Sequence, residues 1–476
     1  MSQARWRFVL GGILLLAAVL RLSGLEVQSL WMNELDSWWI SQHEDLALIL
    51  GRGIFHDPHP QGFQLILWLW IKALGDGEAQ LRTLPVLAGL ATVALMAGLG
   101  RRLYDPLTGL VAASFTAVSW MPLYYAQEAR AYALLMALAV AGSWMLWNLL
   151  ERREAGRSAP WPLVLGFVLT AAALCYVHYF GILVVGFFGA AVLLRLGITL
   201  WTAGLFLAIG LLYLPWLPSL LADLGVEKHW IPPLTWRTLP NWYLATFNQS
   251  ALLALLIALP LQAWATWSAW RDRPSGTDWR RDPTLFLVLW IVLPLGVVTL
   301  KSLVSLPVIS TRNLIICLPP LLLLAARGVT CLPLATRGRA LVGGIVSLVL
   351  LTHLLFGLDY YTRPVKEDFR GIVAAVLEHP THAEAPVAGS NRPYYYDYYL
   401  RAGSAGQHVA VVATNGSHAS RLDALAGTAP GRTIWLLNGR FFRPDEALLA
   451  HLDAHYELLE VHERHRARAA LYRLRD

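Results

Sequence analysis

Two acidic side chains stand close together at the edge of the first apolar stretch of the chain. The segment SLWMNELDSWW (29–39) places Asn33, Glu34 and Asp36 among three tryptophans. If the segment is helical, Asn33 and Asp36 share a face, and Glu34 points about a third of a turn away. A carboxylate in such a place can act as a general base toward a substrate hydroxyl. The same acids could instead only stabilise a helix N-terminus through its dipole.

A stiff polar turn, HDPHPQG, follows at residues 56–62. Its side chains Asp57 and His59 are candidates for substrate binding, because two prolines limit the freedom of the backbone that carries them. The turn could also be no more than the entry to a helix. A His-x-x-His spacing occurs in metal sites, but this spacing alone is weak evidence for a metal.

The segment QEARAY (127–132) places Glu128, Arg130 and Tyr132 between two apolar runs. Ionisable groups are costly within or beside a membrane span, and for that reason they are candidates for function. An arginine on the outer side of the membrane opposes the usual distribution of basic residues, so we expect an anion to hold Arg130. Glu128 or a phosphate group could be that anion.

Single charged residues beside other apolar runs are further candidates. Snorkelling cations and interfacial histidines are the alternative explanation for them. The last two members of the set could contact lipid head groups or dock a domain. These residues are His178, Lys301, Arg312, Lys366 and Arg370.

The composition is that of a membrane protein. Only 14% of the residues are charged and 56% are hydrophobic, whereas about 25% are charged in a soluble domain. The net charge of +7 comes from arginines scattered over short loops, which fits membrane topology and gives no reason to expect a nucleic acid partner. The three cysteines form no CxxC motif, so we expect neither a metal site nor a disulfide.

Apolar runs recur along the chain and predict about eleven transmembrane helices. The basic loops between them are expected on the cytoplasmic side. No small-residue cleavage site follows the first run, which predicts an uncleaved signal anchor in the inner (plasma) membrane. The runs lie near residues 7–24, 83–100, 107–124, 131–150, 161–178, 181–195, 200–221, 249–269, 284–300, 309–326 and 340–358.

One further apolar segment, at 62–75, tests this scheme. Counted as a twelfth span, it would reverse the side of the basic loops up to that point. It has the short length that is typical of interfacial segments, so we expect it to lie along the outer membrane face. Residues 25–81 then form one long outer loop with interfacial helices.

The character of the chain changes after residue 359, which predicts a membrane domain at 1–359 and an extracytoplasmic α/β domain at 360–476. Four short segments have the composition of strands, and two segments between them read as helices. No glycine-rich phosphate loop opens either helix. The strand segments are APVAGSN, HVAVVA, TIWLLN and YELLEVHER, and the helical segments are RLDALAGT and PDEALLAHLDAHY.

The motifs, taken in order, resemble bacterial glycosyltransferases of family 39 and their relatives. These relatives include protein O-mannosyltransferases and lipid A aminoarabinose transferases, which have the GT-C fold. The resemblance covers residues 1 to about 375. It rests on the order of SLWMNELDSWW, DPHPQGFQLILWLW, AQLRTLPVLAGLATVALMAGLGRRLYD, YYAQEARAYALL, YVHYFGILVV, STRNLIICLPPLLLLAARG and KEDFRG. It implies that a sugar passes from a polyprenyl-phosphate carrier to an acceptor on the non-cytoplasmic side.

The resemblance also implies roles for particular residues. The family carries an Asp-Glu pair after SLW-x, with the Asp as general base, and Asn33 and Glu34 stand there in this chain. An amide cannot accept the proton, so Asp36 is a possible substitute. His59 takes the place of a cation that meets the carrier phosphate. The positions that match the family further include Arg82, Glu128, Arg130, Tyr132, His178 and Arg312, and Lys366 lies in the matching KEDFRG segment.

The expected reaction is an inverting single displacement. Asp36 or Glu34 deprotonates the acceptor hydroxyl, and Arg130, His59 and Arg312 hold the charge that develops on the leaving phosphate. The acceptor could be a protein, a lipid or a glycan. No cofactor is required, although a divalent cation is possible. The alternatives are an inactive relative that binds or flips lipid-linked sugars, and a glycan ligase or polymerase that uses a lipid diphosphate.

Overall fold

The contacts of the chain divide it into two compact units. The computed structural model describes residues 1–51, 59–223, 231–276, 278–381, 385–389, 392–403, 410–411, 419–439 and 445–476. One unit, called here the membrane unit, comprises Met1–Ser23, Glu44–Gly75 and Gln80–Tyr361. The other, called the α/β unit, comprises Gly24–His43, Asp76–Ala79 and Thr362–Asp476. The first part of the long loop predicted at 25–81 therefore packs with the C-terminal residues.

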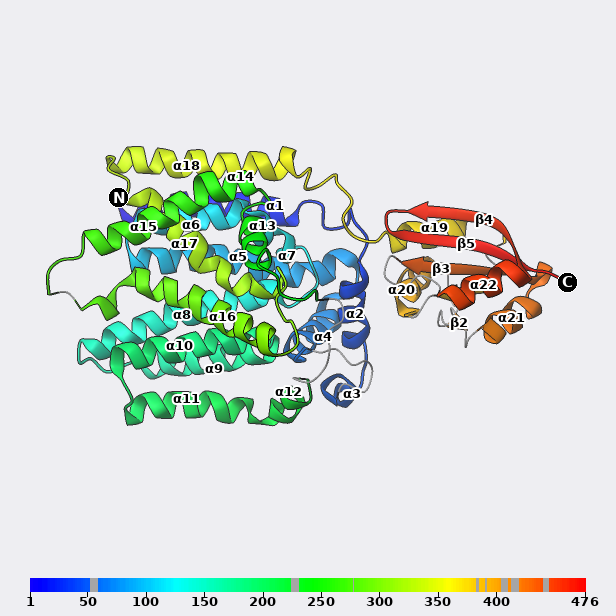
Figure 1. Cartoon of the computed structure of the whole chain (residues 1–476), viewed down its shortest axis with the longest axis horizontal. Coiled ribbons are helices and arrows are strands. Elements are labelled where there is room, and N and C mark those ends of the chain that lie inside the picture. The colour runs from blue at the N-terminus through cyan, green and yellow to red at the C-terminus, as the bar shows by residue number, and fades with distance from the viewer. Residues whose placement is uncertain are drawn as a thin grey trace. The chain divides into compact units, whose positions relative to one another are not determined.

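The regular elements described in the membrane unit are all helices (Figure 1). Its helices are α1 (Gln3–Leu22), α3 (Leu46–Gly51), α4 (Gly62–Leu74), α5 (Glu78–Leu103), α6 (Pro106–Val118), α7 (Trp120–Ala126), α8 (Tyr132–Glu154), α9 (Trp161–Val177), α10 (Phe180–Leu196), α11 (Leu200–Tyr213), η1 (Leu214–Trp216), α12 (Leu217–Asp223), α13 (Thr238–Thr246), α14 (Ala251–Leu253), η2 (Ala254–Ala258), α15 (Leu259–Arg271), η3 (Trp279–Arg281), α16 (Pro283–Val304), η4 (Asn313–Cys317), α17 (Leu318–Thr330), α18 (Thr336–Thr352) and η5 (His353–Gly357).

Seven helical segments among the described residues are long and apolar enough to cross a membrane. Some of them consist of consecutive helices, such as α11, η1 and α12, which together form Leu200–Asp223. An eighth span results if α6 and α7, which meet at a bend of 60°, are counted together. The expected number of about eleven is not confirmed, although each predicted apolar run coincides with a helix or with consecutive helices. The helices α4, α9 and α10 are apolar but shorter. An interfacial position for α4 stays a prediction.

Helix α17 with η4 forms the centre of the membrane unit, because 94% of the residues in Asn313–Thr330 are buried. It packs on α6, α15, α16 and α18. Gly328 permits the closest of these approaches, since a Cβ atom there would lie 2.0 Å from the carbonyl oxygen of Leu261 in α15. Small residues commonly allow such close packing of helices within membranes.

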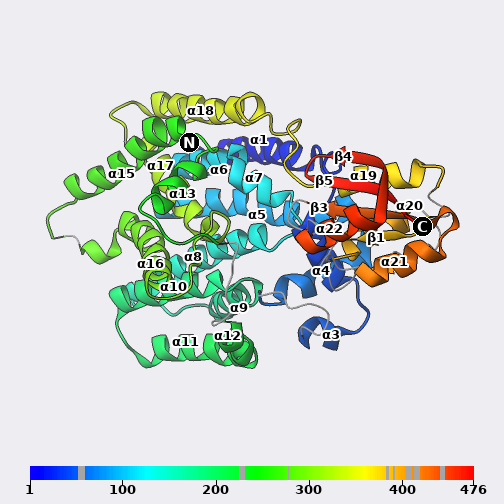
Figure 2. The same cartoon turned by 45° about the vertical axis from the view of Figure 1, so that its right-hand side comes forward.

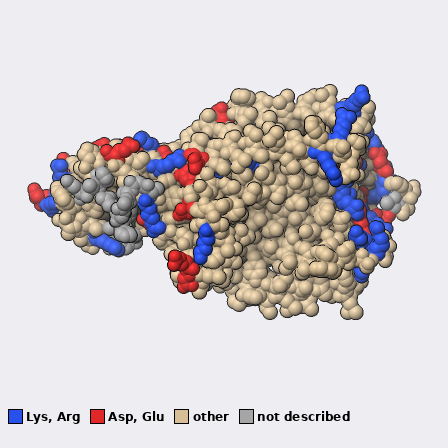
Figure 3. Space-filling model, turned by 180° about the vertical axis from the view of Figure 1, so that it is seen from behind, with Lys and Arg blue, Asp and Glu red and all other residues tan. Residues whose placement is uncertain are grey.

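The basic loops of the membrane unit are joined by ion pairs, which places them at one end of the bundle. The three pairs are Arg102–Glu151, Arg195–Glu154 at 2.7 Å and Arg281–Glu154 at 3.6 Å. Figure 3 shows a band of basic side chains beside a broad surface without charge on this unit. This separation agrees with the topology expected from the loops, whose cytoplasmic side stays a prediction.

The α/β unit contains a mixed sheet with strand order β2-β1-β3-β5-β4. The strands β1 and β2 and the strands β1 and β3 are parallel, whereas β5 is antiparallel to both β3 and β4. The elements are α2 (Met32–Ser41), α19 (Phe369–Glu378), β1 (Val387–Gly389), α20 (Tyr394–Gly403), β2 (Ala410–Val411), α21 (Ala419–Thr428), η7 (Pro430–Arg432), β3 (Thr433–Gly439), α22 (Glu446–His455), β4 (Tyr456–Arg464) and β5 (Ala467–Leu474).

Strand β3 lies in the middle of this sheet and is buried along its whole length. Because side chains alternate along a strand, Ile434 and Leu436 form a core with residues of α21 and α22. Figure 2 shows these two helices, in orange and red, beside the strands. Trp435 lies against His379, the residue that follows α19, with ring centroids 5.3 Å apart. All four predicted strand segments carry a strand, and β5 was not predicted.

Candidate active site

Helix α2 carries the acids of SLWMNELDSWW and begins at Met32. Its third helical residue, Glu34, reaches back to accept a hydrogen bond of 3.4 Å from the backbone N–H of Trp31. An acid at this position satisfies one of the N–H groups that a helix start leaves open and interacts favourably with the helix dipole. The helix therefore presents Glu34, Asp36 and the half-buried Asn33 from one short, rigid segment.

Glu34 forms an ion pair with Lys366 within the α/β unit. The Nζ atom of Lys366 lies 2.8 Å from Oε2 of Glu34, and the two side chains are 7% and 0% exposed. The neighbouring backbone is also connected, because the Gln28 side chain accepts from the N–H of Lys366 at 3.0 Å and Ser29 donates to the carbonyl of Glu367 at 2.6 Å. Two segments far apart in the sequence thus lie together.

Asp36 is held by three donors, all of which contact its Oδ1 atom. Arg392 Nη1 lies at 2.7 Å, the Tyr394 hydroxyl at 2.7 Å and the Tyr395 hydroxyl at 2.9 Å. Burial raises the pKa of both tyrosines, and the charge of Asp36 adds to this shift. Burial would lower the pKa of Arg392, but Asp36 and the tyrosines outweigh it, so the pKa is raised.

A third acid of the α/β unit, Glu78, lies where α5 begins and was missed from the sequence. Its Oε2 accepts from Arg370 at 2.9 Å and its Oε1 from the Tyr399 hydroxyl at 2.6 Å. The Tyr399 hydroxyl in turn accepts from the N–H of Leu30 at 2.7 Å. The run of tyrosines after Arg392 was the signal in the sequence that could have indicated these contacts.

In the membrane unit, aromatic rings from three predicted motifs come together. The centroid of the His178 ring lies 4.7 Å from that of the His59 ring and 5.6 Å from that of the Tyr132 ring. Tyr125 extends the group, with its ring 4.9 Å from Tyr132. His178 stands between α9 and α10, and its Nδ1 accepts from the N–H of Phe180 at 3.1 Å. The ring is thus fixed by the start of α10.

The predicted charged residues of this unit gather near two tyrosines. Tyr125 lies within electrostatic reach of Glu128 and Arg312, and Tyr360 lies within reach of Glu128 and Arg82. Arg82 and Glu128 are buried, and so is Arg130, whose N–H donates to the Glu128 carbonyl at 2.6 Å. The fold therefore collects cations and aromatic rings in one region from motifs spread over the unit.

The first residue of QEARAY has a structural role. The amide of Gln127 donates to the carbonyls of Arg21 at 2.9 Å and Ser23 at 2.7 Å, which closes the open end of α1. The Arg21 side chain donates to the carbonyls of Thr116 and Ala117 at 3.1 and 3.0 Å, where α6 ends at the bend. This buried arginine was not among the residues predicted from the sequence.

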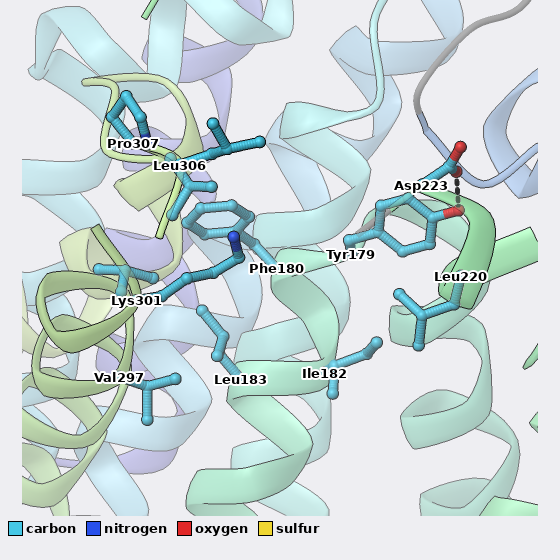
Figure 4. Close-up of a pocket in the computed structure, with 12 residues that line it drawn as sticks. Tyr179, Phe180, Ile182, Leu183, Leu220, Asp223, Val297, Lys301, Leu306 and Pro307 are labelled. Carbon is cyan, nitrogen blue, oxygen red and sulfur yellow. Dashed lines mark hydrogen bonds between the residues drawn. The ribbon is translucent and has the colours of Figure 1, made fainter. Parts of the chain in front are cut away.

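An apolar cavity of ≈ 260 Å³ begins one residue after His178. Figure 4 shows Phe180, Leu183 and Val297 around it, with Lys301 from α16 reaching toward Phe180. At its other side the Tyr179 hydroxyl donates to the Asp223 carboxylate. The cavity combines an apolar wall with one cation, Lys301, and one carboxylate, Asp223.

The predictions for Asp57 and for a divalent cation are not tested by these observations. Asp57 falls outside the described residues. Among the residues that the structure describes, no group of three or more His, Cys, Asp or Glu side chains is arranged to hold a metal ion, so a need for a divalent cation stays untested.

Comparison with solved structures shows which fold the chain has. ArnT from Cupriavidus metallidurans in the apo state aligns with 99% of this chain and 98% of its own, at a TM-score of 0.62 and 14% identity. The archaeal oligosaccharyltransferase AglB from Archaeoglobus fulgidus aligns with 98% of this chain and 74% of its own, at a TM-score of 0.58 and 10% identity. The arabinofuranosyltransferase AftD from Mycobacteria aligns with 99% of this chain and 42% of its own, at a TM-score of 0.52 and 16% identity. The chain has the GT-C fold.

No protein-family model matches the sequence, and no curated protein matches it. The likeness to the solved structures therefore lies in the fold.

Proposed function

We propose that the protein is a membrane glycosyltransferase that moves a sugar from a polyprenyl-phosphate carrier to an acceptor hydroxyl on the outer side of the inner membrane. The observation that carries this proposal is the pairing of a carboxylate-bearing helix, α2, with the GT-C fold of the chain. Proteins that share this fold are solved with undecaprenyl phosphate or a dolichol-phosphate. The acceptor is a protein, a lipid or a glycan.

The membrane unit supplies the features that a phosphate-bearing lipid needs. Arginines and histidines stabilise phosphate by charge and by hydrogen bonds, and the residues proposed for this role are His59, Arg82, Arg130, His178 and Arg312. The apolar cavity beside Lys301 is proposed to take part of the isoprenoid chain, because its walls are almost entirely apolar. Glu128 and Tyr132 are proposed to orient these donors.

Of the two acids on α2, Asp36 suits the role of general base better. Glu34 is fully buried and its carboxylate contacts Lys366 at 2.8 Å. The Asp36 side chain is 10% exposed, and all three of its donors contact Oδ1. No described residue donates to its Oδ2 atom, which leaves this oxygen as the acceptor for a substrate proton.

The proposed reaction is a single displacement with inversion. The acceptor O–H bond breaks as its proton passes to Asp36, and the acceptor oxygen forms a bond to the anomeric carbon. The bond from that carbon to the carrier phosphate breaks, and both of its electrons stay with the phosphate. The cations of the membrane unit stabilise this charge as it develops.

The test uses purified protein in lipid with radiolabelled polyprenyl-phosphate hexoses and a cell-envelope extract as the source of acceptors. Wild type is compared with Asp36→Asn and Glu34→Gln. The matched controls are Asp453→Asn and Glu378→Gln, which change exposed acids of the α/β unit. Transfer by wild type and the controls, with loss in Asp36→Asn, supports the proposal. Label that stays on every carrier in wild type contradicts it.

A second candidate function is the binding or flipping of a lipid-linked sugar without chemistry. Asn33 favours it, because this amide stands where the family resemblance implies an aspartate. Wild type that binds the labelled carrier and transfers nothing would support this second function.

A further inference from the structure

We propose that Arg392, Tyr394 and Tyr395 are positioning residues that orient the Asp36 carboxylate and hold helix α2 for the reaction. This inference rests on the proposed function and extends it to the α/β unit. It assigns to the C-terminal part of the chain a direct part in the geometry of the catalytic group.

The first support is the arrangement of hydrogen bonds around Asp36. Three donors at 2.7 to 2.9 Å meet at Oδ1, and none of the described residues donates to Oδ2. A carboxylate held by one oxygen cannot rotate freely, so its other oxygen keeps a fixed direction. A group that only anchors a helix has no need of this asymmetry, whereas a general base requires a directed and open oxygen.

The second support is the constancy of the donors. The guanidinium of Arg392 is always charged at physiological pH. Burial keeps the hydroxyls of Tyr394 and Tyr395 protonated, since it raises the pKa of each. The carboxylate therefore keeps the same three donors at every pH below the raised pKa of the two tyrosines.

The third support is a set of aromatic contacts between α2 and α20. Trp39 stacks on Tyr394 with ring centroids 4.8 Å apart and 11° between the planes. Trp38 meets the ring of Tyr398 edge-on at 4.8 Å. Residues on successive turns of α20 thus fix the helix that bears Asp36, and its backbone cannot shift without breaking these contacts.

The consequence for catalysis is a change in rate without a change in donor binding. The three positioning residues belong to the α/β unit, and the residues proposed to hold the donor phosphate belong to the membrane unit. Loss of orientation at a reacting group can cost about 100-fold in rate. We therefore expect Arg392→Met to lower kcat by about 100-fold and to leave the KM for the donor unchanged.

The experiment measures kcat, donor KM and the unfolding temperature of the whole chain in lipid. The variants are Arg392→Met, Arg392→Lys, Arg392→Ala and Tyr395→Phe. The control is Arg464→Met, which changes an exposed arginine of β4. Arg392→Lys keeps a charged donor and should regain part of the rate. Added guanidinium ion should raise the rate of Arg392→Ala, which a purely structural role would not produce.

The outcomes separate this inference from the proposed function. If wild type transfers sugar and a folded Arg392→Met variant keeps its kcat, the positioning role is wrong and the function stands. If Arg392→Met does not fold, Tyr395→Phe decides, because it removes one hydroxyl and keeps the ring; an unchanged kcat there overturns the role. If wild type transfers nothing, the proposed function itself fails, and the positioning role fails with it.

Discussion

The amino group of Lys366 lies 2.8 Å from the carboxylate of Glu34, although 332 residues separate them in the sequence. The pair is buried in the α/β unit, close to the hydrogen bonds that join residues 28–29 to residues 365–367. Two buried charges stabilise each other only when both are present, because each alone would lose its solvation without compensation. Lys366 therefore has a structural role beside the substrate contact that its motif predicts.

The first prediction concerns this pair. Lys366→Met leaves the buried Glu34 carboxylate without its cation, and we expect the α/β unit to lose about 3–5 kcal/mol of stability. The double change Glu34→Gln with Lys366→Met should recover much of this loss, because it removes both charges. Thermal unfolding of the chain in lipid measures the loss in Lys366→Met and the recovery in the double variant, with Arg464→Met as control. A single variant as stable as wild type would contradict the prediction.

The second prediction distinguishes the two positions proposed for the base. If Asp36 accepts the proton, Asn33→Asp adds a carboxylate where none is needed, and kcat should stay within about twofold of wild type. A general base contributes about 100-fold or more to a rate. A rise in kcat of about tenfold would therefore show that the native chain lacks its base at residue 33.

The third prediction concerns alkaline pH. Burial raises the pKa of Tyr394 and Tyr395, and the charge of Asp36 raises it further. In the unfolded chain both hydroxyls ionise near pH 10, about the ordinary value for tyrosine. Their contribution to stability is complete below that pH and is lost as the pH rises toward the folded pKa. Unfolding temperatures from pH 8 to 11 should fall more steeply for wild type than for the double variant Tyr394→Phe, Tyr395→Phe. Equal slopes would contradict this.

The fourth prediction tests the ring cluster of the membrane unit. His178→Phe keeps a ring beside His59 and Tyr132 but removes the nitrogen atoms that could contact phosphate. We expect kcat/KM for the donor to fall by about tenfold or more, the size of one charge-assisted contact. The control is His455→Phe, at an exposed position of α22. Unchanged transfer in His178→Phe would limit this residue to capping α10.

The fifth prediction tests the apolar cavity with two substitutions on α16. Val297→Trp places a large ring in the cavity, where Val297 is part of the wall. Val292 lies on the same helix outside the cavity and is equally accessible, at 55% against 51% exposed. If the cavity takes part of the isoprenoid chain, Val297→Trp should raise the donor KM about tenfold, because the filled space excludes apolar contacts worth about 1–2 kcal/mol. The control is Val292→Trp. Equal donor KM values for Val297→Trp and Val292→Trp would contradict this role.

The sequence by itself determined that the protein is a helical membrane protein with a C-terminal α/β part, because the length and period of apolar runs are local properties of a chain. Each predicted run lies on helix, and the four strands expected after residue 359 are present. Local signals also found α2 and its acids, since Trp31 and Glu34 are close enough in sequence to define the helix start. Where these signals weaken, prediction fell short: β5, with its alanines and arginines, is a strand only because β3 and β4 pair with it.

Only the tertiary structure decided what holds the acids. Arg392 lies 356 residues from Asp36 in the sequence, and the pairing follows from the fold, which no local pattern encodes. The same holds for His59 and His178, whose rings meet although they belong to separate motifs. The sequence supplies the chemically active groups, and long-range packing, through which a few rigid helices bring distant residues together, determines which of them act on each other.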